Sequence, residues 1–370
     1  MKFKVEKGIL GAALASLVRI IPSKTTMMVA TDFLFEGKDG KLKIRATDLD
    51  MFVTVDVEAT EVTDGQTLVP GKTVKELVDT LPDTVISFSD EGTKYKSLMI
   101  TWESGSAVLP TFDDPFPEGP VVEDGEVLPV DGKGLGNAVA IALMSITDDA
   151  LRPQLNSVML NFKENALDVA ATDSKQLVVV TIDGSFTAQQ LLLPKKFAQT
   201  IKAFATEDEV TMDIRTDGHT AVVALPNAVI SGTLLSGKYP DYSKVIPDPS
   251  QMQELVVPKA DILGALKTVA SGTNYNFVKM DLALGSVLVE TENASASSRA
   301  RQTIMAPYSG EPMTVGFNAE MLQSIISRMP SDEVVINIKN PRSAVLVTPS
   351  EQPKGWTVKA IAMPVAVNAS

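Results

Sequence analysis

The chain repeats itself about every 120 residues, and this internal repeat limits its fold more than any other feature. Ala46-Thr47-Asp48 and Ala171-Thr172-Asp173 each precede a hydrophobic stretch. Amphipathic helices then begin at Pro70-Gly71-Lys72 and at Pro194-Lys195-Lys196, and a third helix of this type begins at Phe317-Asn318-Ala319. Three copies of one unit therefore account for the whole chain.

Each copy carries the same mixture of helix and strand signals. Apolar residues at three- and four-residue spacing predict opening helices over 9–17, 135–143 and 262–269. Alternating apolar and polar residues predict half-buried strands at 53–58, 210–214 and 334–338. We therefore predict an α+β fold of three similar domains, each with two helices packed on antiparallel sheets. Boundaries in the Pro- and acid-rich loops give domains 1–121, 122–248 and 249–370.

Composition excludes several classes of protein. With 370 residues, 44% hydrophobic and 21% charged, the chain is that of a soluble globular protein with several cores. It contains no apolar run near the roughly 20 residues of a membrane span and no secretion signal, so we expect a cytoplasmic protein without membrane contact. The absence of cysteine and the single histidine, His219, exclude disulfides, thiol catalysis and two-histidine metal sites. We expect neither a metal nor a cofactor.

Two patterns point weakly to enzyme chemistry. Gly71-Lys72-Thr73 resembles the end of a phosphate-binding loop, but that loop needs a glycine at position 66, where the chain has Gln66. Asp48 and Asp50 could form a metal or acid/base pair on a strand, although a solvated turn explains them better. A nucleotide-dependent enzyme is therefore an alternative, and calorimetric nucleotide binding would distinguish it.

The charges are unevenly placed along the chain. With 33 basic and 46 acidic residues, the net charge of −13 repels a polyanion at long range. A set of ten basic residues nevertheless lies on or beside the repeated helices, whereas many acids lie in loops. A basic inner face on an acidic body would still bind DNA locally. The basic residues of the helices are Lys72, Lys75, Lys195, Lys196, Lys202, Lys259, Lys267 and Arg328, with Lys24 and Arg152 just beyond the opening helices.

The size of the repeat favours a ring of six domains. A domain of about 120 residues has a diameter of roughly 35 Å, and six such bodies enclose a hole of about 35 Å, whereas four leave about 15 Å. Duplex DNA, roughly 20 Å across, passes only the larger hole. Three domains in each chain then imply a dimer closed head to tail.

Several motifs, spread from residue 1 to about 367, resemble the bacterial sliding clamp family, the beta subunits of DNA polymerase III. They are Met1-Lys2-Phe3 with Val5-Glu6, Ala46-Thr47-Asp48-Leu49-Asp50-Met51, Ala171-Thr172-Asp173 with Leu177, Lys238-Tyr239-Pro240-Asp241-Tyr242 with Lys244-Val245-Ile246-Pro247, Tyr308-Ser309-Gly310, Gly316-Phe317-Asn318 and Met363-Pro364. The resemblance implies the DNA clamp fold, in which a ring-shaped homodimer encircles duplex DNA without regard to sequence. It also implies a non-catalytic processivity factor that tethers the polymerase alpha subunit, the clamp loader and other clamp-motif proteins.

The resemblance also implies site residues. Those expected to contact DNA are Lys24, Lys72, Arg152, Lys195 and Lys196. Those expected to form a pocket for a partner peptide, between the second and third domains, are Leu155, Thr172, Ser174, Lys175, Gln176, Leu177, Pro240, Lys244, Val245, Ile361, Ala362, Met363, Pro364 and Val365.

The chain departs from the family at three places. Ser174-Lys175-Gln176 stands where members often have Gly-His-Arg, and Pro153-Gln154 stands where an aromatic pair is common. The family's usual Met-Pro-Met-Arg-Leu ending is replaced by Met363-Pro364-Val365-Ala366-Val367. These differences, with the acidic total, also suit an alternative: a ring-forming interaction platform that is no longer loaded on DNA.

Overall fold

The computed structural model describes residues 1–90, 96–123, 125–149, 151–205, 211–273, 276–293 and 297–367, so Val210 of one expected strand lies outside it. The chain folds into two compact units. Unit 1 comprises Met1–Gly136 and Gln199–Leu234, and unit 2 comprises Asn137–Ala198 and Leu235–Ser370. The divisions fall inside two helices, α3 (Gly132–Ala142) and α4 (Lys195–Phe204).

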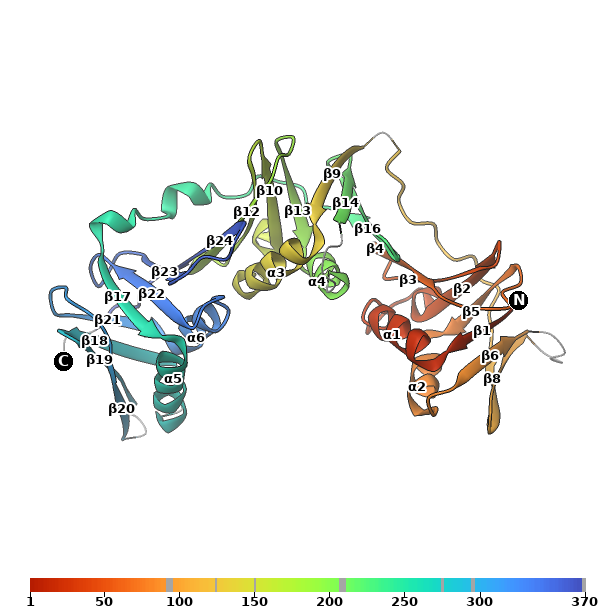
Figure 1. The fold of residues 1–370 in the computed structure, drawn as a ribbon, viewed down its shortest axis with the longest axis horizontal. Helices are drawn as coiled ribbons and strands as arrows, with labels where there is room; N and C mark the ends of the chain where they lie inside the picture. Colours follow the sequence, from red (N-terminus) through yellow and green to blue (C-terminus); the bar gives the residue numbers. More distant parts are fainter. Residues whose placement is uncertain are drawn as a thin grey trace. The chain divides into compact units, whose positions relative to one another are not determined.

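Unit 1 contains an eight-stranded and a four-stranded sheet, and their strand pairs are antiparallel (Figure 1). In spatial order, the larger sheet is β5 (Gly65–Pro70), β2 (Asp32–Lys38), β3 (Lys41–Thr47), β4 (Met51–Val57), β16 (Ala228–Thr233), β15 (Thr220–Leu225), β14 (Thr211–Thr216) and β9 (Glu126–Asp131). The smaller sheet is β1 (Lys2–Glu6), β6 (Val85–Ser89), β7 (Ser97–Trp102) and β8 (Gly105–Pro110).

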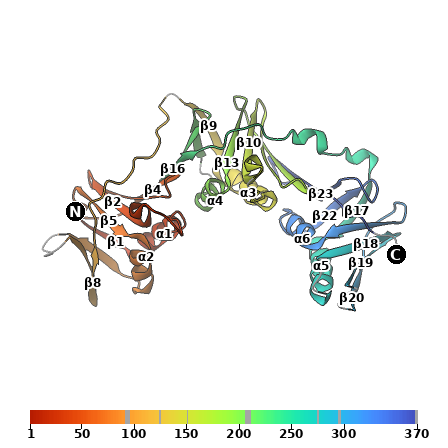
Figure 2. The same cartoon turned by 180° about the vertical axis from the view of Figure 1, so that it is seen from behind.

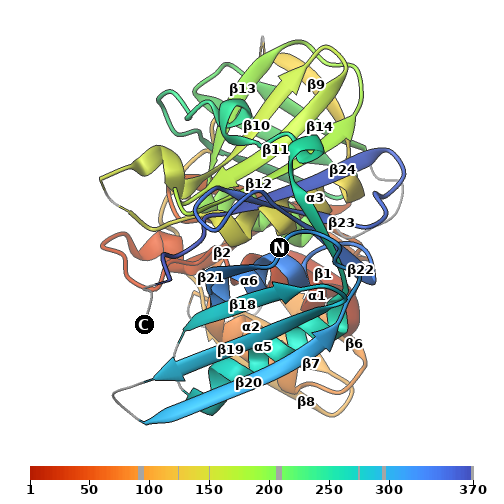
Figure 3. The ribbon, with the colours of Figure 1, turned by 90° about the vertical axis from the view of Figure 1, so that its left-hand side faces the viewer.

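Unit 2 repeats this plan (Figure 2). Its larger sheet is β13 (Gln189–Pro194), β10 (Ser157–Lys163), β11 (Ala166–Thr172), β12 (Gln176–Asp183), β24 (Trp356–Ala362), β23 (Val345–Pro349), β22 (Glu333–Ile338) and β17 (Gln253–Pro258). Its smaller sheet, seen face on in Figure 3, is β20 (Ser298–Met305), β19 (Ser286–Asn293), β18 (Phe277–Ala283) and β21 (Met313–Asn318). The strands of segment 122–248 are thus divided between the two large sheets.

Helices cover these sheets because each helix has one apolar face, which packs against a sheet. In unit 1, α1 (Lys7–Leu17) packs on β3 and β4 and against α2 (Gly71–Thr80). In unit 2, α5 (Lys259–Thr273) packs on β19 and β20 and against α6 (Ala319–Ser327). Short 3₁₀ turns connect other elements: η1 (Met28–Thr31), η2 (Leu143–Ser145), η3 (Pro153–Asn156), η4 (Tyr242–Val245) and η5 (Pro249–Gln251).

The core of unit 1 lies where its two sheets meet. Phe3, Phe35 and Phe88 are fully buried, and the Phe3 ring stacks on Phe88 with 4.6 Å between ring centroids. These rings come from β1, β2 and β6, so they join the small sheet to the large one. Buried aromatic rings contribute strongly to cohesion through their large apolar area.

The sequence-based expectation of an α+β fold is confirmed. Helices α1, α3 and α5 lie where the opening helices were predicted, and α2, α4 and α6 lie at the three amphipathic helix starts. At α6 the start is capped, because the side-chain oxygen of Asn318 accepts a hydrogen bond from the Met321 N–H at 2.9 Å. None of the helices in the described ranges is both long and apolar enough to cross a membrane.

Candidate partner-binding pocket

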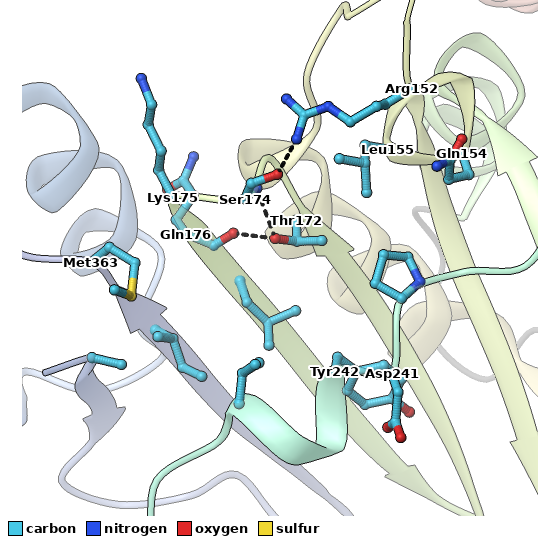
Figure 4. Close-up of a pocket in the computed structure, with 15 residues that line it drawn as sticks. Arg152, Gln154, Leu155, Thr172, Ser174, Lys175, Gln176, Asp241, Tyr242 and Met363 are labelled. Carbon is cyan, nitrogen blue, oxygen red and sulfur yellow. Dashed lines mark hydrogen bonds between the residues drawn. The ribbon is translucent and has the colours of Figure 1, made fainter.

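Unit 2 contains a pocket of about 340 Å³ (Figure 4). Its walls come from η3, from the turn between β11 and β12, from the segment that includes η4, and from the ends of β23 and β24. The lining residues are Arg152, Gln154, Leu155, Thr172, Ser174, Lys175, Gln176, Leu177, Pro240, Asp241, Tyr242, Val245, Ala344, Ile361 and Met363.

The pocket floor is part of the hydrophobic core. Leu177, Tyr242 and Ile361 belong to one buried apolar cluster. At the rim, in contrast, Val245 is 56% exposed and Met363 is 41% exposed. Exposed apolar side chains above a buried apolar floor favour an apolar ligand, because binding removes their surface from water.

The turn between β11 and β12 is fixed by its own side chains. The Thr172 hydroxyl donates to the Gln176 carbonyl at 2.6 Å and accepts from the Ser174 N–H at 3.1 Å. One Asp173 carboxylate oxygen accepts from the N–H groups of Lys175 and Gln176, both at 2.8 Å. Ser174 has a φ of +77°, a left-handed conformation that suits the glycine common in the family better than serine. The Thr-Asp pair therefore builds one wall of the pocket.

The same turn explains the repeated Ala-Thr-Asp motif. In unit 1 the Thr47 hydroxyl donates to the Met51 carbonyl at 2.8 Å, and the Asp48 carboxylate accepts from the Met51 N–H at 2.8 Å. Leu49 takes the left-handed position, with a φ of +81°. The structure thus gives Asp48 a turn-forming role, as the stronger of the two sequence interpretations expected.

A buried carboxylate holds the η4 wall. Asp168 of β11 is 3% exposed and accepts hydrogen bonds from the Tyr242 hydroxyl at 2.5 Å and the Thr181 hydroxyl at 2.7 Å. Lys163 forms an ion pair with the same carboxylate. Burial and the Asp168 carboxylate both raise the pKa of Tyr242, so its hydroxyl remains a donor at neutral pH. Because Tyr242 also lines the pocket, this bond fixes the wall to the sheet.

Arg152 lies on the pocket rim. Its Nη1 donates to the Ser174 hydroxyl at 2.7 Å, and its Nε donates to an Asp149 carboxylate oxygen at 2.8 Å (Figure 4 shows the contact with Ser174). The Leu151 N–H and then Arg152 lower the pKa of Asp149, which stays ionised. Sequence reasoning assigned Arg152 to DNA contact, and its place in this pocket was not foreseen.

The chain beyond β24 is held at two points. The Met363 N–H donates to the Lys175 carbonyl at 2.9 Å, and the Val365 N–H donates to the Gly316 carbonyl at 2.8 Å. The second bond lays the segment along β21 at its outer edge. Gly316 permits this approach, because a Cβ there would stand 2.5 Å from the Val365 carbonyl oxygen. Met363 is thus anchored on both sides.

The structure brings together ten of the fourteen residues expected at the pocket. Lys244 does not line it and instead pairs with Asp241 at 2.8 Å, and Ala362 is fully buried. Pro364 and Val365 follow the rim residue Met363 without lining the cavity. The residues that sequence reasoning left out are Arg152, Gln154, Asp241, Tyr242 and Ala344. Asp241 and Tyr242 lay inside the quoted Tyr-Pro-Asp-Tyr motif, whereas Ala344 carries no signal in the sequence.

The residues expected to contact DNA fall in both units. In unit 1, Lys24 and Lys72 line one shallow hollow of about 480 Å³ at the start of α2. In unit 2, Lys195 and Lys196 begin α4, and Lys195 pairs with Asp148 at 2.9 Å. The glycine of Gly71-Lys72-Thr73 has a packing role, because a Cβ there would stand 2.4 Å from Ile21 Cδ1.

The family follows from comparison with known proteins. Residues 1–115 match the family described as DNA polymerase III beta subunit, N-terminal domain, and residues 129–241 match its central domain. A beta sliding clamp of Chlamydia muridarum is 25% identical over 359 residues, covering 95% of this chain and 96% of the relative. A beta sliding clamp of Rickettsia felis is 24% identical over 384 residues, covering 99% and 100%.

Solved structures agree on the fold. The DNA polymerase III beta subunit of Thermotoga maritima matches with a TM-score of 0.89 at 23% identity, over 99% of both chains. The sliding clamp of Pseudomonas aeruginosa bound to griselimycin matches with a TM-score of 0.88 at 20% identity, over 99% of this chain and 100% of that one.

A pair of large antiparallel sheets, each built from two equivalent halves and covered by helices, defines a DNA clamp fold. The chain belongs to the DNA polymerase III beta subunit family, and it is a sliding clamp of DNA replication. Members of this family are processivity factors and not catalysts. The family assignment therefore overturns the alternative of a nucleotide-dependent enzyme.

Proposed function

We propose that two copies of this chain close into a ring around duplex DNA and tether the replicative polymerase. The observation that carries the proposal is the order of the strands. Both large sheets join two four-stranded halves, through β4 beside β16 in unit 1 and β12 beside β24 in unit 2. The two small sheets have the same internal orders as these halves. In the part of the chain that the structure describes, however, each ends in a strand with a neighbour on one side only, β8 or β20.

Pairing β8 of one copy with β20 of the other would make a third sheet of the same kind. In the small sheets, β8 occupies the position of β16 and β20 occupies the position of β4. Both edges carry apolar side chains in water: Val108 is 57% exposed and Met305 is 77% exposed. Long unpaired edges are aggregation-prone unless a partner covers them. Head-to-tail pairing of two copies covers both edges and closes a ring.

Three similar domains per copy, at 1–121, 122–248 and 249–370, give this ring six domains. The small sheet of unit 1 and the β2–β5 half belong to the first domain, and the corresponding strands β17–β24 belong to the third. The two halves contributed by the central segment would then be the second domain. A cytoplasmic place of action, where chromosomal replication occurs in bacteria, is part of the same proposal.

The basic residues at the starts of α2 and α4 would face the DNA. The N-termini of these helices carry Lys72 in α2, and Lys195 and Lys196 in α4. At a helix N-terminus the helix dipole disfavours a cation but stabilises a bound phosphate. Lys24 shares a hollow with Lys72. Such phosphate contacts carry no sequence information. A topologically closed ring needs only weak contacts, which leave it able to slide.

The pocket of unit 2 would bind a short apolar peptide of the polymerase, the clamp loader or other partners. Met363 at its rim is flexible and polarizable, which allows one pocket to accept different apolar side chains. Tethering a polymerase in this way raises its effective concentration at the primer end.

Primer extension on a long primed circular template tests this function. With the cognate polymerase and clamp loader, addition of the chain should lengthen the products of a single binding event by at least about tenfold, because tethering replaces repeated bimolecular encounters. Product lengths that do not change when the chain is added, while a control clamp lengthens them, would contradict the proposal.

A further inference from the structure

The large sheet of unit 1 carries a basic hollow that none of the roles above uses. The hollow has a volume of about 480 Å³, and we define it by its lining residues Glu36, Lys38, Asp39, Lys41, Lys43, Arg45 and Thr54. It therefore has four cations and two acids, in a chain whose net charge is −13. It lies on β2, β3 and β4.

Strand alternation places these cations on one face. Lys41, Lys43 and Arg45 alternate along β3 with the buried residues Leu42 and Ile44. Since α1 packs on β3 and β4, the buried side faces the helix and the basic side faces away from it. The hollow is thus on the sheet face opposite α1.

The arrangement carries an electrostatic cost. Lys38 and Lys41 are direct cross-strand partners in the β2–β3 pairing. Like charges at such positions destabilise a sheet. In the part of the chain that the structure describes, neither lysine has an ion-pair partner. A cost of this kind is offset when an anion binds between the two ammonium groups.

One end of the hollow already holds an acidic segment of the chain itself. The guanidinium of Arg45 donates to a Glu118 carboxylate oxygen at 3.0 Å and lies 5.4 Å from the centroid of the Phe116 ring. Both partners belong to the acid-rich segment that follows β8. Lys43 is partly neutralised by Asp56, 3.6 Å away. The Lys38 and Lys41 end has no comparable partner among the described residues.

We propose that the basic hollow is a second docking site, which binds an extended acidic segment of a partner protein. Alternate residues of a strand are about 6.8 Å apart, so an acidic segment with carboxylates at every second residue matches the spacing of the β3 cations. At the Arg45 end of the hollow, the Glu118 carboxylate already accepts a hydrogen bond from one of these cations. The site belongs to unit 1 and shares no lining residue with the apolar pocket of unit 2.

The lining of the hollow, as described, favours an acidic peptide over single-stranded nucleic acid, because it offers no ring on which bases could stack. Sites for single strands combine cations with aromatic side chains on which bases stack. No aromatic residue lines the hollow as the structure describes it. The Phe116 ring at the Arg45 end is engaged by Arg45. The hollow therefore offers charge alone, which suits carboxylates on an extended peptide.

Fluorescence anisotropy with a labelled peptide of alternating glutamate and threonine tests the proposal. The variant carries Lys38→Glu with Lys41→Glu, and the control carries Lys354→Glu with Lys359→Glu, two exposed lysines of unit 2. At low salt the first variant should bind the acidic peptide about tenfold more weakly than the unmodified protein, whereas the control should stay within about twofold. A glutamine–threonine peptide should not bind.

Two results would overturn the proposal. Equal losses in the two variants would mean that the peptide responds only to net charge. Oligothymidylate that binds the unmodified protein more tightly than the acidic peptide, and is lost in the Lys38→Glu, Lys41→Glu variant alone, would assign the hollow to nucleic acid.

Discussion

The backbone N–H of Met363 donates to the carbonyl oxygen of Lys175 at 2.9 Å, which ties the end of β24 to the turn between β11 and β12. Two walls of the pocket, distant in sequence, are thereby held in fixed relation. The next bond along the chain, from the Val365 N–H to the Gly316 carbonyl, secures the same segment to β21. The shape of the pocket thus depends in part on Gly316 and Val365, which do not line it.

Gly316→Ala should weaken peptide binding, although residue 316 does not contact the peptide. The new Cβ would stand 2.5 Å from the Val365 carbonyl oxygen and 2.8 Å from the Phe277 ring, so the terminal segment must move and carry Met363 with it. We expect a loss of affinity of roughly five- to tenfold for a clamp-motif peptide, equivalent to about 1–1.4 kcal/mol. Isothermal calorimetry measures it.

Gly264→Ala is the matched control for this substitution. Gly264 lies in α5, and none of the residues that the structure describes has an atom within 4 Å of an added Cβ. This change should leave peptide affinity intact and stabilise the helix by about 0.5–1 kcal/mol. Unchanged affinity in Gly316→Ala would show that the terminal segment does not set the pocket.

Met363→Ala with Val245→Ala should reduce peptide affinity by at least about tenfold, because both side chains are exposed at the rim and would be buried by a ligand. Folding should be little affected for the same reason. Val229→Ala, at a residue of β16 that is 41% exposed, removes a similar exposed apolar group elsewhere. If the double variant binds a clamp-motif peptide as tightly as this control, the pocket is not the binding site.

Val108→Asp should turn dimers into monomers. The substitution places a charge on the β8 edge, where pairing with β20 of a second copy would bury it. Sedimentation velocity measures the change. The control is Val127→Asp. Val127 is 42% exposed and lies on β9, an edge strand of the large sheet that takes no part in the proposed interface. A Val108→Asp protein that remains dimeric at the same concentration contradicts this edge pairing.

The free energy of unfolding of unit 2 should fall in acid, because Glu290 stabilises the unit only while it is ionised. Its buried carboxylate pairs with Lys279 and with Arg299 of the β20 edge, each at 2.7 Å. Lys279 and then Arg299 hold the pKa of Glu290 below its usual value near 4.5. A lowered folded-state pKa contributes stability above the unfolded-state pKa, and that contribution is lost as the pH falls through the folded-state value.

Glu290→Gln tests this assignment. At pH 7 the variant should lose about 1–2 kcal/mol, or roughly 3–6 °C in the unfolding midpoint, because it loses two charge-assisted hydrogen bonds whose cationic partners, Lys279 and Arg299, are partly exposed. The gap should narrow as the pH falls below about 4.5. A gap that is constant from pH 7 to pH 3 would show that packing, and not the charge of Glu290, is responsible.

Local signals predicted much of the fold. The helices could be placed from apolar spacing and the starts at Pro70 and Pro194, because both depend on neighbouring residues. The Ala-Thr-Asp repeat was visible in the sequence, and its turn geometry explains it. The joining of β4 to β16 could not be predicted, because the pairing connects strands far apart in the chain.

The pocket shows the same limit. Its residues were inferred from a family resemblance, and the structure places most of them around one cavity. The bond from Tyr242 to Asp168, across 74 positions, has no local signal, so the anchor of the η4 wall was missed. Arg152 was assigned to DNA contact from its charge and the family resemblance. Its contacts with Asp149 and Ser174, which place it at the pocket rim as well, have no local signal in the sequence.

The most direct test of the ring is retention on circular and linearised duplex DNA. The chain is loaded by its cognate clamp loader, and the complex is then isolated at a salt concentration that removes electrostatically bound protein. We predict retention on the circle and loss from the linear form, because only a closed ring is trapped by topology. Equal loss from both forms, while a control clamp is retained on the circle, would contradict the sliding ring and favour an interaction platform that is not loaded on DNA.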